Sequence, residues 1–219
     1  RGGAYIAATR YKSDDFTPYL YRPTDWGRSW QRITDGIPED EFTRALRADP
    51  DRRGLLYAGT EKGIYVSRDD GRNWSSLQLN LPITPITDLA VKNKDLVAAT
   101  QGRGYWILDD LTTLHQFEED IPDKAAHLYG PRDAIRLTAG GRSEDPGAAG
   151  TNPPVGAVVR YSLGDDLPED VELSLSIYEA RGSEPIWTFT RKPSDGEEEE
   201  AGGPNAPPNT KVLSADKGL

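Results

Sequence analysis

Short runs of apolar residues recur along the first half of the chain, each bounded by glycine, proline, aspartate or asparagine. Three of these runs share one pattern of apolar and small residues: YIAAT at 5–9, LYAGT at 56–60 and LVAAT at 96–100. Runs of this length and composition predict β-strands that are joined by turns. Because no segment places apolar residues at the roughly 3.6-residue spacing of an amphipathic helix, the pattern favours an all-β fold.

Two further patterns repeat together with these strands. The segment GIYVSRD at 63–69 returns as GYWILDD at 104–110, and PTDWGRSW at 23–30 is a near copy of SRDDGRNW at 67–74. A period of about 40 to 45 residues that contains several short strands is typical of the blades of a β-propeller. The sequence therefore predicts a partial propeller of about three blades over residues 1–137.

The middle repeat predicts one complete blade of this propeller. Its four strands are expected at 43–49, 55–60, 63–68 and 74–79, each bounded by residues that favour turns. Four strands are also the usual content of a propeller blade. The SRDDGRNW segment then falls on the hairpin between the third and the fourth strand.

The residues of this hairpin predict a turn that is held by side chains. Asp69 is expected to accept hydrogen bonds from backbone N–H groups of its own turn, while Gly71 adopts a positive φ. Trp74 is expected to fold back over the hairpin and pack against the sheet. The first copy of the segment keeps the same residue types as Asp25, Gly27 and Trp30. We therefore interpret all six residues as structural.

The segment with Ser67, Asp69, Gly71 and Trp74 resembles the Asp-box, S-x-D-x-G-x-T-W, which is also called the BNR repeat. The first copy departs from the box at Pro23, which stands in the place of the serine. Over the predicted blades the chain resembles large bacterial BNR-repeat proteins of the sortilin-like or glycosyl-hydrolase-like kind. In the Asp-box families the box lies on the side of the propeller away from the ligand. The resemblance therefore implies that the boxes are packing elements.

A ligand is expected at the opposite end of the strands, where loops between the second and third strands meet the connections between blades. The candidate binding residues in these loops are Arg10, Asp14, Asp15, Glu61, Lys62 and Arg103. No residue is predicted to be catalytic, because no G-x-S-x-G motif or other catalytic signature occurs. No metal or cofactor is expected either, because neither His115 nor His127 has partners at the spacing of metal ligands.

The composition changes after residue 137. Residues 138–154 are rich in glycine, alanine and proline, so they predict a linker. Alternating apolar and polar residues return beyond it, and residues 155–219 predict an incomplete immunoglobulin-like β-sandwich. Its strands are expected at 156–163, 171–180 and 186–192, with a flexible acidic loop at 194–209.

Charge and cysteine content exclude several classes of protein. The chain of 219 residues carries 36 acidic and 26 basic residues, and the basic residues are scattered among the acidic ones. Binding to nucleic acid is therefore not expected, because it needs clustered lysine and arginine. The absence of cysteine excludes disulfides and thiolate metal sites. No apolar run reaches the ~18 residues of a membrane helix, so no transmembrane segment is predicted.

Two functional hypotheses remain open. The first is a non-catalytic extracytoplasmic protein, periplasmic or secreted, whose propeller rim and sandwich bind a protein partner, neighbouring subunits, a membrane complex or a carbohydrate. The second, implied by the resemblance, is a fragment of a sialidase-like or glucanase-like glycoside hydrolase whose site is completed by further blades. A glucanase-like site needs two carboxylates roughly 5 to 9.5 Å apart, for which Asp14 or Asp15 with Glu61 are the candidates. In either case we expect a longer protein, with its signal peptide outside the printed chain.

Overall fold

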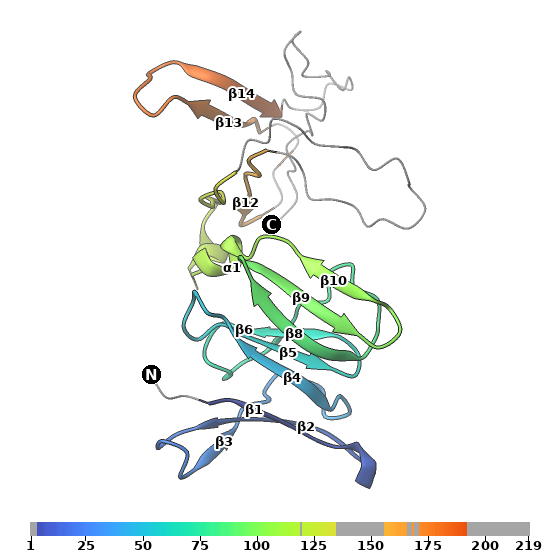
Figure 1. Cartoon of the computed structure of the whole chain (residues 1–219). Coiled ribbons are helices and arrows are strands. Elements are labelled where there is room, and N and C mark those ends of the chain that lie inside the picture. Colours follow the sequence, from blue (N-terminus) through green and yellow to red (C-terminus); the bar gives the residue numbers. More distant parts are fainter. Residues whose placement is uncertain (1–3, 119, 135–155, 166–167, 169–170, 192–219) are drawn as a thin grey trace. The chain divides into compact units, whose positions relative to one another are not determined.

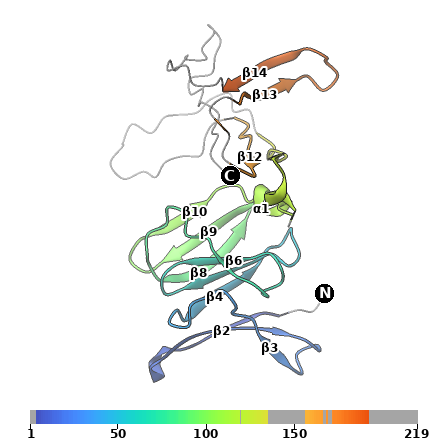
Figure 2. The ribbon, with the colours of Figure 1, turned by 180° about the vertical axis from the view of Figure 1, so that it is seen from behind.

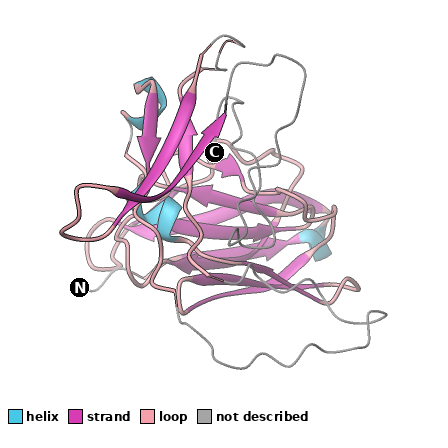
Figure 3. Cartoon of the chain, turned by 90° about the horizontal axis from the view of Figure 1, so that it is seen from above, coloured by secondary structure: helices cyan, strands magenta, loops and turns pink. Residues whose placement is uncertain are grey.

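The computed structural model describes residues 4–118, 120–134, 156–165, 168 and 171–191. Within these residues strands prevail, and the helices are one short α-helix and two 3-10 turns (Figure 3). The prediction of an all-β fold is confirmed. None of the helices in the described part is long and apolar enough to cross a membrane. The expected linker at 138–154 and the expected acidic loop at 194–209 lie outside the described residues.

The chain forms two compact units. The first comprises Arg1–Gln116 with Arg132–Ala157, and the second comprises Phe117–Pro131 with Val158–Leu219. The sequence grouped residues 1–137 together, whereas the structure assigns Phe117–Pro131 to the second unit. The reason is that Ala126–Leu128 pairs as a strand with Tyr161–Leu163, across a long separation in sequence.

The first unit contains three antiparallel sheets. Sheet A has the order β1-β2-β3, with β1 at Ile6–Arg10, β2 at Asp15–Pro23 and β3 at Trp30–Arg32. A 3-10 turn, η1 at Tyr11–Ser13, connects β1 to β2, and Asp14 ends it in the left-handed region with a φ of 56°. This turn directs the side chains after β1 back over the end of the sheet.

Sheet B is the four-stranded meander that the middle repeat predicts. Its order is β4-β5-β6-β7, with β4 at Thr43–Ala48, β5 at Leu56–Thr60, β6 at Ile64–Ser67 and β7 at Ser75–Ser76. The fourth strand is shorter than the expected 74–79. Its extended conformation ends early because the N–H of Leu81 bonds to the C=O of Gln78 in a turn.

Sheet C has the order β10-β9-β8 and departs from the repeat at its end. The strands are β8 at Ile86–Lys92, β9 at Asp95–Thr100 and β10 at Tyr105–Leu108. The chain then enters α1 at Thr112–Gln116, a helix of five residues that the sequence pattern did not predict. The carboxylate of Asp110 accepts hydrogen bonds from the N–H and the hydroxyl of Thr112, at 3.1 and 2.6 Å. Such a contact favours the start of a helix, because it satisfies a free N–H of the first turn.

The three sheets are stacked one above another (Figure 1, Figure 2). Strand β4 packs against β1 and β2, and β8 packs against β4 and β5. All five residues of β5 are buried, because alternate side chains of this central strand enter two different cores. The core between sheets A and B contains Leu20, Ile33, Ile37, Leu46, Leu56, Ala58 and Trp74. The core between sheets B and C includes Leu55, Tyr57, Ile64, Val66, Ile86, Leu89, Leu96 and Leu111.

The second unit contains two small sheets. Strand β11 at Ala126–Leu128 follows the 3-10 turn η2 at Ile121–Asp123 and pairs with β12 at Tyr161–Leu163. Strands β13 at Leu173–Tyr178 and β14 at Pro185–Arg191 form a hairpin. The three strands predicted here are thus present, but the strand expected at 156–163 is reduced to its last residues. The immunoglobulin-like sandwich itself remains a prediction.

Candidate functional site

The loops expected to bind a ligand meet at one end of the stacked sheets. Glu61, in the loop from β5 to β6, donates its N–H to the C=O of Phe42 at 3.2 Å. Gln101, in the loop from β9 to β10, donates its N–H to the C=O of Pro85 at 2.9 Å. Backbone bonds therefore fix each of these loops to the connection that precedes its own sheet. We call the surface formed by residues 10–16, 40–44, 61–63, 84–85 and 101–104 the loop end.

Three aromatic rings and an arginine form a cluster at the loop end. The rings of Tyr11 and Phe42 stack with their centroids 5.0 Å apart, and Phe16 lies 6.0 Å from Phe42. The guanidinium carbon of Arg44 lies 5.0 Å from the centroid of Phe42 and 5.7 Å from that of Tyr11. Attraction between the cation and the two ring faces holds the guanidinium in place. Phe42 is buried, whereas Phe16 is 49% exposed and offers its ring to a partner.

Arg44 makes one side-chain hydrogen bond within the described residues. Its Nε donates to a carboxylate oxygen of Glu61 at 2.7 Å, and 23% of its side chain is exposed. The two terminal NH2 groups therefore have no hydrogen-bond partner among the described residues. A guanidinium fixed on one side and open on the other can bind a carboxylate through two parallel hydrogen bonds.

The structure brings most of the predicted binding residues into ion pairs. Arg10 lies 3.3 Å from the carboxylate of Asp15, which also accepts the hydroxyl of Tyr19 at 2.8 Å. Hydrogen bonds from Tyr19 and Thr17 hold the pKa of Asp15 below its ordinary value. Asp15 is therefore a charged, engaged carboxylate rather than a proton donor.

Lys62 lies in a second charged group of the loop end. Its Nζ is 2.8 Å from Asp40 and 3.6 Å from the buried carboxylate of Glu41. The hydrogen bond between Lys62 and Asp40 raises the pKa of the lysine and lowers that of the aspartate. Glu41 also accepts the hydroxyls of Thr60 at 3.2 Å and Tyr65 at 3.1 Å. These bonds fix the loop after β5 to the segment that precedes β4.

Asp14 and Arg103 are not brought together with the other candidates. Asp14 serves as the left-handed residue that ends η1. Arg103 is exposed, and its backbone N–H donates to the hydroxyl of Thr100 at 3.1 Å while its C=O accepts the indole N–H of Trp106 at 3.1 Å. Within the described residues, neither side chain contacts another of the six candidates.

Sequence reasoning missed the aromatic cluster. Tyr11 and Phe16 lie in the same expected loop, residues 10–18, as Arg10, Asp14 and Asp15, and two aromatic residues within it were a usable signal. Phe42 and Arg44 belong to the next repeat, so only the stacking of sheet B on sheet A brings them to these rings.

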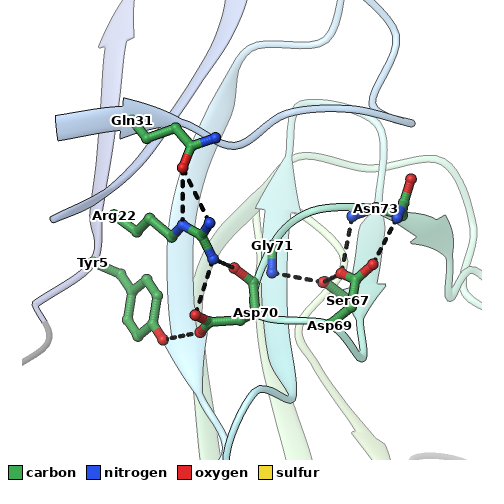
Figure 4. A network of polar contacts seen from close by, with 8 residues as sticks. All are labelled: Tyr5, Arg22, Gln31, Ser67, Asp69, Asp70, Gly71 and Asn73. Carbon is green, nitrogen blue, oxygen red and sulfur yellow. Dashed lines mark hydrogen bonds and ion pairs between the residues drawn. The ribbon is translucent and has the colours of Figure 1, made fainter. Parts of the chain in front are cut away.

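The opposite end of the strands carries the 67–74 turn, which is drawn in Figure 4. The hydroxyl of Ser67 donates to Asp69 at 2.8 Å and accepts the N–H of Gly71 at 2.9 Å. Asp69 also accepts the N–H of Asn73 at 2.9 Å. Burial alone would raise the pKa of Asp69, but the hydrogen bonds from Asn73 and Ser67 outweigh it and lower the pKa. The aspartate thus closes the turn as a carboxylate.

Trp74 fixes this turn to the preceding repeat. Its indole N–H donates to the C=O of Ile33 at 2.8 Å, and its backbone N–H donates to the C=O of Asp35 at 2.8 Å. Gly71 has a φ of 84°, and a Cβ at this position would lie 2.5 Å from the Cδ1 of Ile33. The turn therefore connects sheet B to sheet A and also closes a hairpin of sheet B.

The 23–30 turn has the same backbone but a different environment. The N–H of Ser29 donates to Asp25, as the N–H of Asn73 does to Asp69. The next residue has a positive φ in both turns, 62° at Trp26 and 67° at Asp70. Trp30 differs from the expectation, because it is 40% exposed and belongs to neither core.

Asp70 links the turn of sheet B to sheet A. Arg22 donates to its C=O at 3.2 Å and to its carboxylate at 3.0 Å, and the hydroxyl of Tyr5 donates to the same carboxylate (Figure 4). Burial and the hydrogen bond to Asp70 raise the pKa of Tyr5 to about 12, so this donor stays neutral. These contacts join sheet B to sheet A.

Replacing Asp69 with alanine is expected to lower the free energy of unfolding by about 1–2 kcal/mol, because the Ser67 hydroxyl and the Asn73 N–H lose their acceptor. Urea unfolding measures the change. Asp25→Ala is the matched control, because Asp25 closes a turn of the same shape outside the two cores. It is expected to lower the free energy of unfolding by less than Asp69→Ala does. If Asp25→Ala lowered the free energy of unfolding as much as Asp69→Ala, the 67–74 turn would not stabilise the contact between sheets A and B.

His115 has a partner that sequence spacing did not reveal. Its Nε2 lies 2.8 Å from the carboxylate of Asp49, which also accepts the hydroxyl of Tyr57 at 2.9 Å and the N–H groups of Asp51 and Arg52 at 2.8 and 3.0 Å. Ligand atoms of Asp49, Asp51 and His115 lie within 4.8 Å of one another. Because both oxygens of Asp49 are already engaged, this group joins β4 and β5 to α1, and no metal is assigned to it.

Comparisons with known proteins give little beyond this geometry. No family model matches the chain, and no curated protein matches it. Among solved structures, the chain is similar to that of YCF48 bound to D1 peptide, with 26% sequence identity and a TM-score of 0.32. The match covers 41% of this chain and 29% of the other. With so low a TM-score, it supports neither a family nor a function for this chain.

Proposed function

We propose that this chain is a non-catalytic binding module that recognises a polypeptide partner through the loop end. The observation that carries the proposal is the cluster of Tyr11, Phe16, Phe42 and Arg44. Exposed aromatic rings and arginine are the side chains that contribute most to the affinity of protein interfaces. Here the rings pack on one another and Glu61 accepts a hydrogen bond from Arg44, and contacts of this kind reduce the entropy lost on binding.

The scaffold that we propose for this surface is a partial Asp-box β-propeller. Three successive antiparallel sheets stack in chain order, and the 67–74 turn carries the hydrogen bonds expected of such a box. The hairpin of β13 and β14 would then belong to an immunoglobulin-like sandwich. An extracytoplasmic location, periplasmic or secreted, follows from the resemblance of the sequence alone and is part of the proposal.

The charges of the loop end favour binding over hydrolysis. A glucanase-like site needs one carboxylate that is protonated and one that is free to attack or to activate water. Asp15 is paired with Arg10 and has a lowered pKa, while Glu61 is bonded to Arg44. Both carboxylates are therefore engaged by arginine side chains.

A selection with random peptides tests the proposal. Twelve-residue peptides displayed on phage are selected on the full chain, and calorimetry then measures the affinity of each enriched peptide. We expect the peptides to carry a carboxylate next to an aromatic residue, and Arg44→Ala to weaken their binding at least tenfold (about 1.4 kcal/mol). Phe16→Ala, at an exposed position, is expected to weaken binding without a change in stability.

Arg47 provides the matched control. It lies on β4, as Arg44 does, and pairs with Asp88 away from the loop end. Arg47→Ala is expected to keep the affinity within about twofold. The proposal fails if no enriched peptide distinguishes Arg44→Ala from Arg47→Ala. Hydrolysis of a fluorogenic sialoside or glucoside by the full chain, lost in Asp15→Asn or Glu61→Gln, would establish the hydrolase instead.

A further inference from the structure

Successive sheets of the first unit repeat one connection. Residues 33–37 follow β3, the last strand of sheet A, and residues 77–81 follow β7, the last strand of sheet B. Both begin with an N–H that bonds back to the neighbouring strand, β2 in sheet A and β6 in sheet B, and both contain the same tight turn. The equivalent bonds are Ile33 N–H to Leu20 C=O (2.9 Å) with Leu77 N–H to Ile64 C=O (2.8 Å), and Ile37 N–H to Thr34 C=O (3.0 Å) with Leu81 N–H to Gln78 C=O (2.8 Å).

The two connections differ in what covers them. Trp74 packs on residues 33–37 and donates its indole N–H to the C=O of Ile33. The corresponding place on residues 77–81 is a shallow hollow, because sheet C continues into α1 instead of a turn with a tryptophan. The residues that line this hollow include Ile64, Leu77, Leu79, Leu81, Leu96 and Trp106. Leu79 is 70% exposed at its rim.

The edge of sheet C beside the hollow has unpaired backbone groups. The C=O of Gly104 accepts the N–H of Thr100 at 3.1 Å, so this residue faces β9. Because backbone groups alternate in direction along a strand, those of Tyr105 and Ile107 face outward. In sheet A β2 pairs with β3, and in sheet B β6 pairs with β7. Among the described residues, no strand pairs with the outer edge of β10.

We propose that the β10 edge and the hollow together bind an extended strand of a partner polypeptide that carries a tryptophan. The chain itself contains such an arrangement. Strand β7 pairs with β6 in sheet B, while Trp74, which directly precedes β7, packs on residues 33–37 of sheet A. The partner's indole would fill the hollow and donate to the C=O of Leu77, as Trp74 donates to Ile33. Three residues later, a partner N–H would bond to the C=O of Tyr105, as Leu77 bonds to Ile64. This site shares no residue with the loop end and does not depend on the proposed function.

A peptide that copies the chain's own strand is the probe. The acetylated and amidated peptide NWSSLQ repeats residues 73–78 and is titrated into the full ¹⁵N-labelled chain, with binding followed by NMR. We expect saturable shifts at the amides of Ile107 and Leu79. Replacing the peptide tryptophan with alanine, or N-methylating its leucine, is expected to weaken binding at least tenfold. The first change removes the indole that fills the hollow, and the second removes the N–H that bonds to the C=O of Tyr105.

Variants of the chain locate the bound strand. Ile107→Pro removes an outward N–H at an exposed edge position and is expected to abolish the shifts, whereas Ile107→Val keeps that N–H and the binding. The N-methylated peptide makes the same test on an unaltered chain if Ile107→Pro does not fold. Shifts confined to the 67–74 turn, unchanged affinity with the N-methylated peptide, or no saturable shift at about 1 mM peptide would each overturn the proposal. So would a concentration-dependent dimer that covers the Ile107 amide and excludes the peptide.

Discussion

Replacing Trp74 with alanine is expected to lower the free energy of unfolding by about 3–5 kcal/mol, the usual cost of removing a buried tryptophan side chain. Trp74 is 4% exposed in the core between sheets A and B, so its loss leaves a cavity there. The C=O of Ile33 also loses the indole donor that now satisfies it. Urea unfolding followed by far-ultraviolet circular dichroism measures the change.

Two other tryptophans of the same turn type serve as controls. Trp30 occupies the equivalent position in the 23–30 turn but is 40% exposed, so Trp30→Ala is expected to cost less than about 2 kcal/mol. Trp26 is 87% exposed, and Trp26→Ala is expected to change stability by no more than about 0.5 kcal/mol. Equal losses at Trp30 and Trp74 would show that the turn, rather than the contact between sheets, determines the stability.

Replacing Asp49 with alanine is expected to destabilise the first unit by about 3–5 kcal/mol. The change leaves the hydroxyl of Tyr57, two backbone N–H groups and the Nε2 of His115 without their shared acceptor. Each buried donor without a partner costs about 1–3 kcal/mol. Asp51→Asn is the matched control, because it alters an exposed side chain of the same group and keeps the backbone donor. Its stability is expected to match that of the unaltered chain in urea unfolding.

The contribution of Asp49 is also expected to depend on pH. Burial alone would raise its pKa, but the hydrogen bonds from His115, the two backbone N–H groups and Tyr57 outweigh it and lower the pKa. An aspartate of the unfolded chain titrates near a pKa of about 3.9. The stabilisation is therefore complete above that pH and is lost as the pH falls through the lower value of the folded state. The advantage of the unaltered chain over Asp49→Asn should shrink below about pH 4, and an advantage that grows there would contradict the assignment.

The sequence by itself determined the features that depend on neighbouring residues. Strands β4, β5 and β6 were predicted to within about two residues, because each is a short apolar run between turn residues. In the 67–74 turn the role of Asp69 as acceptor of a backbone N–H was predicted, since Asp69 and Asn73 lie four residues apart. The second copy of this turn, at 23–30, was also predicted from the sequence.

Only the tertiary structure decided what these elements contact. The same turn buries Trp74 and leaves Trp30 partly exposed, because the residues that cover Trp74 belong to another repeat. Likewise, His115 reaches Asp49 across 66 positions of sequence, and Arg44 meets Tyr11 only when sheet B stacks on sheet A. Local pattern fixes the backbone through turn geometry and strand period, whereas burial and charge pairing depend on which distant side chains the stacked sheets bring together.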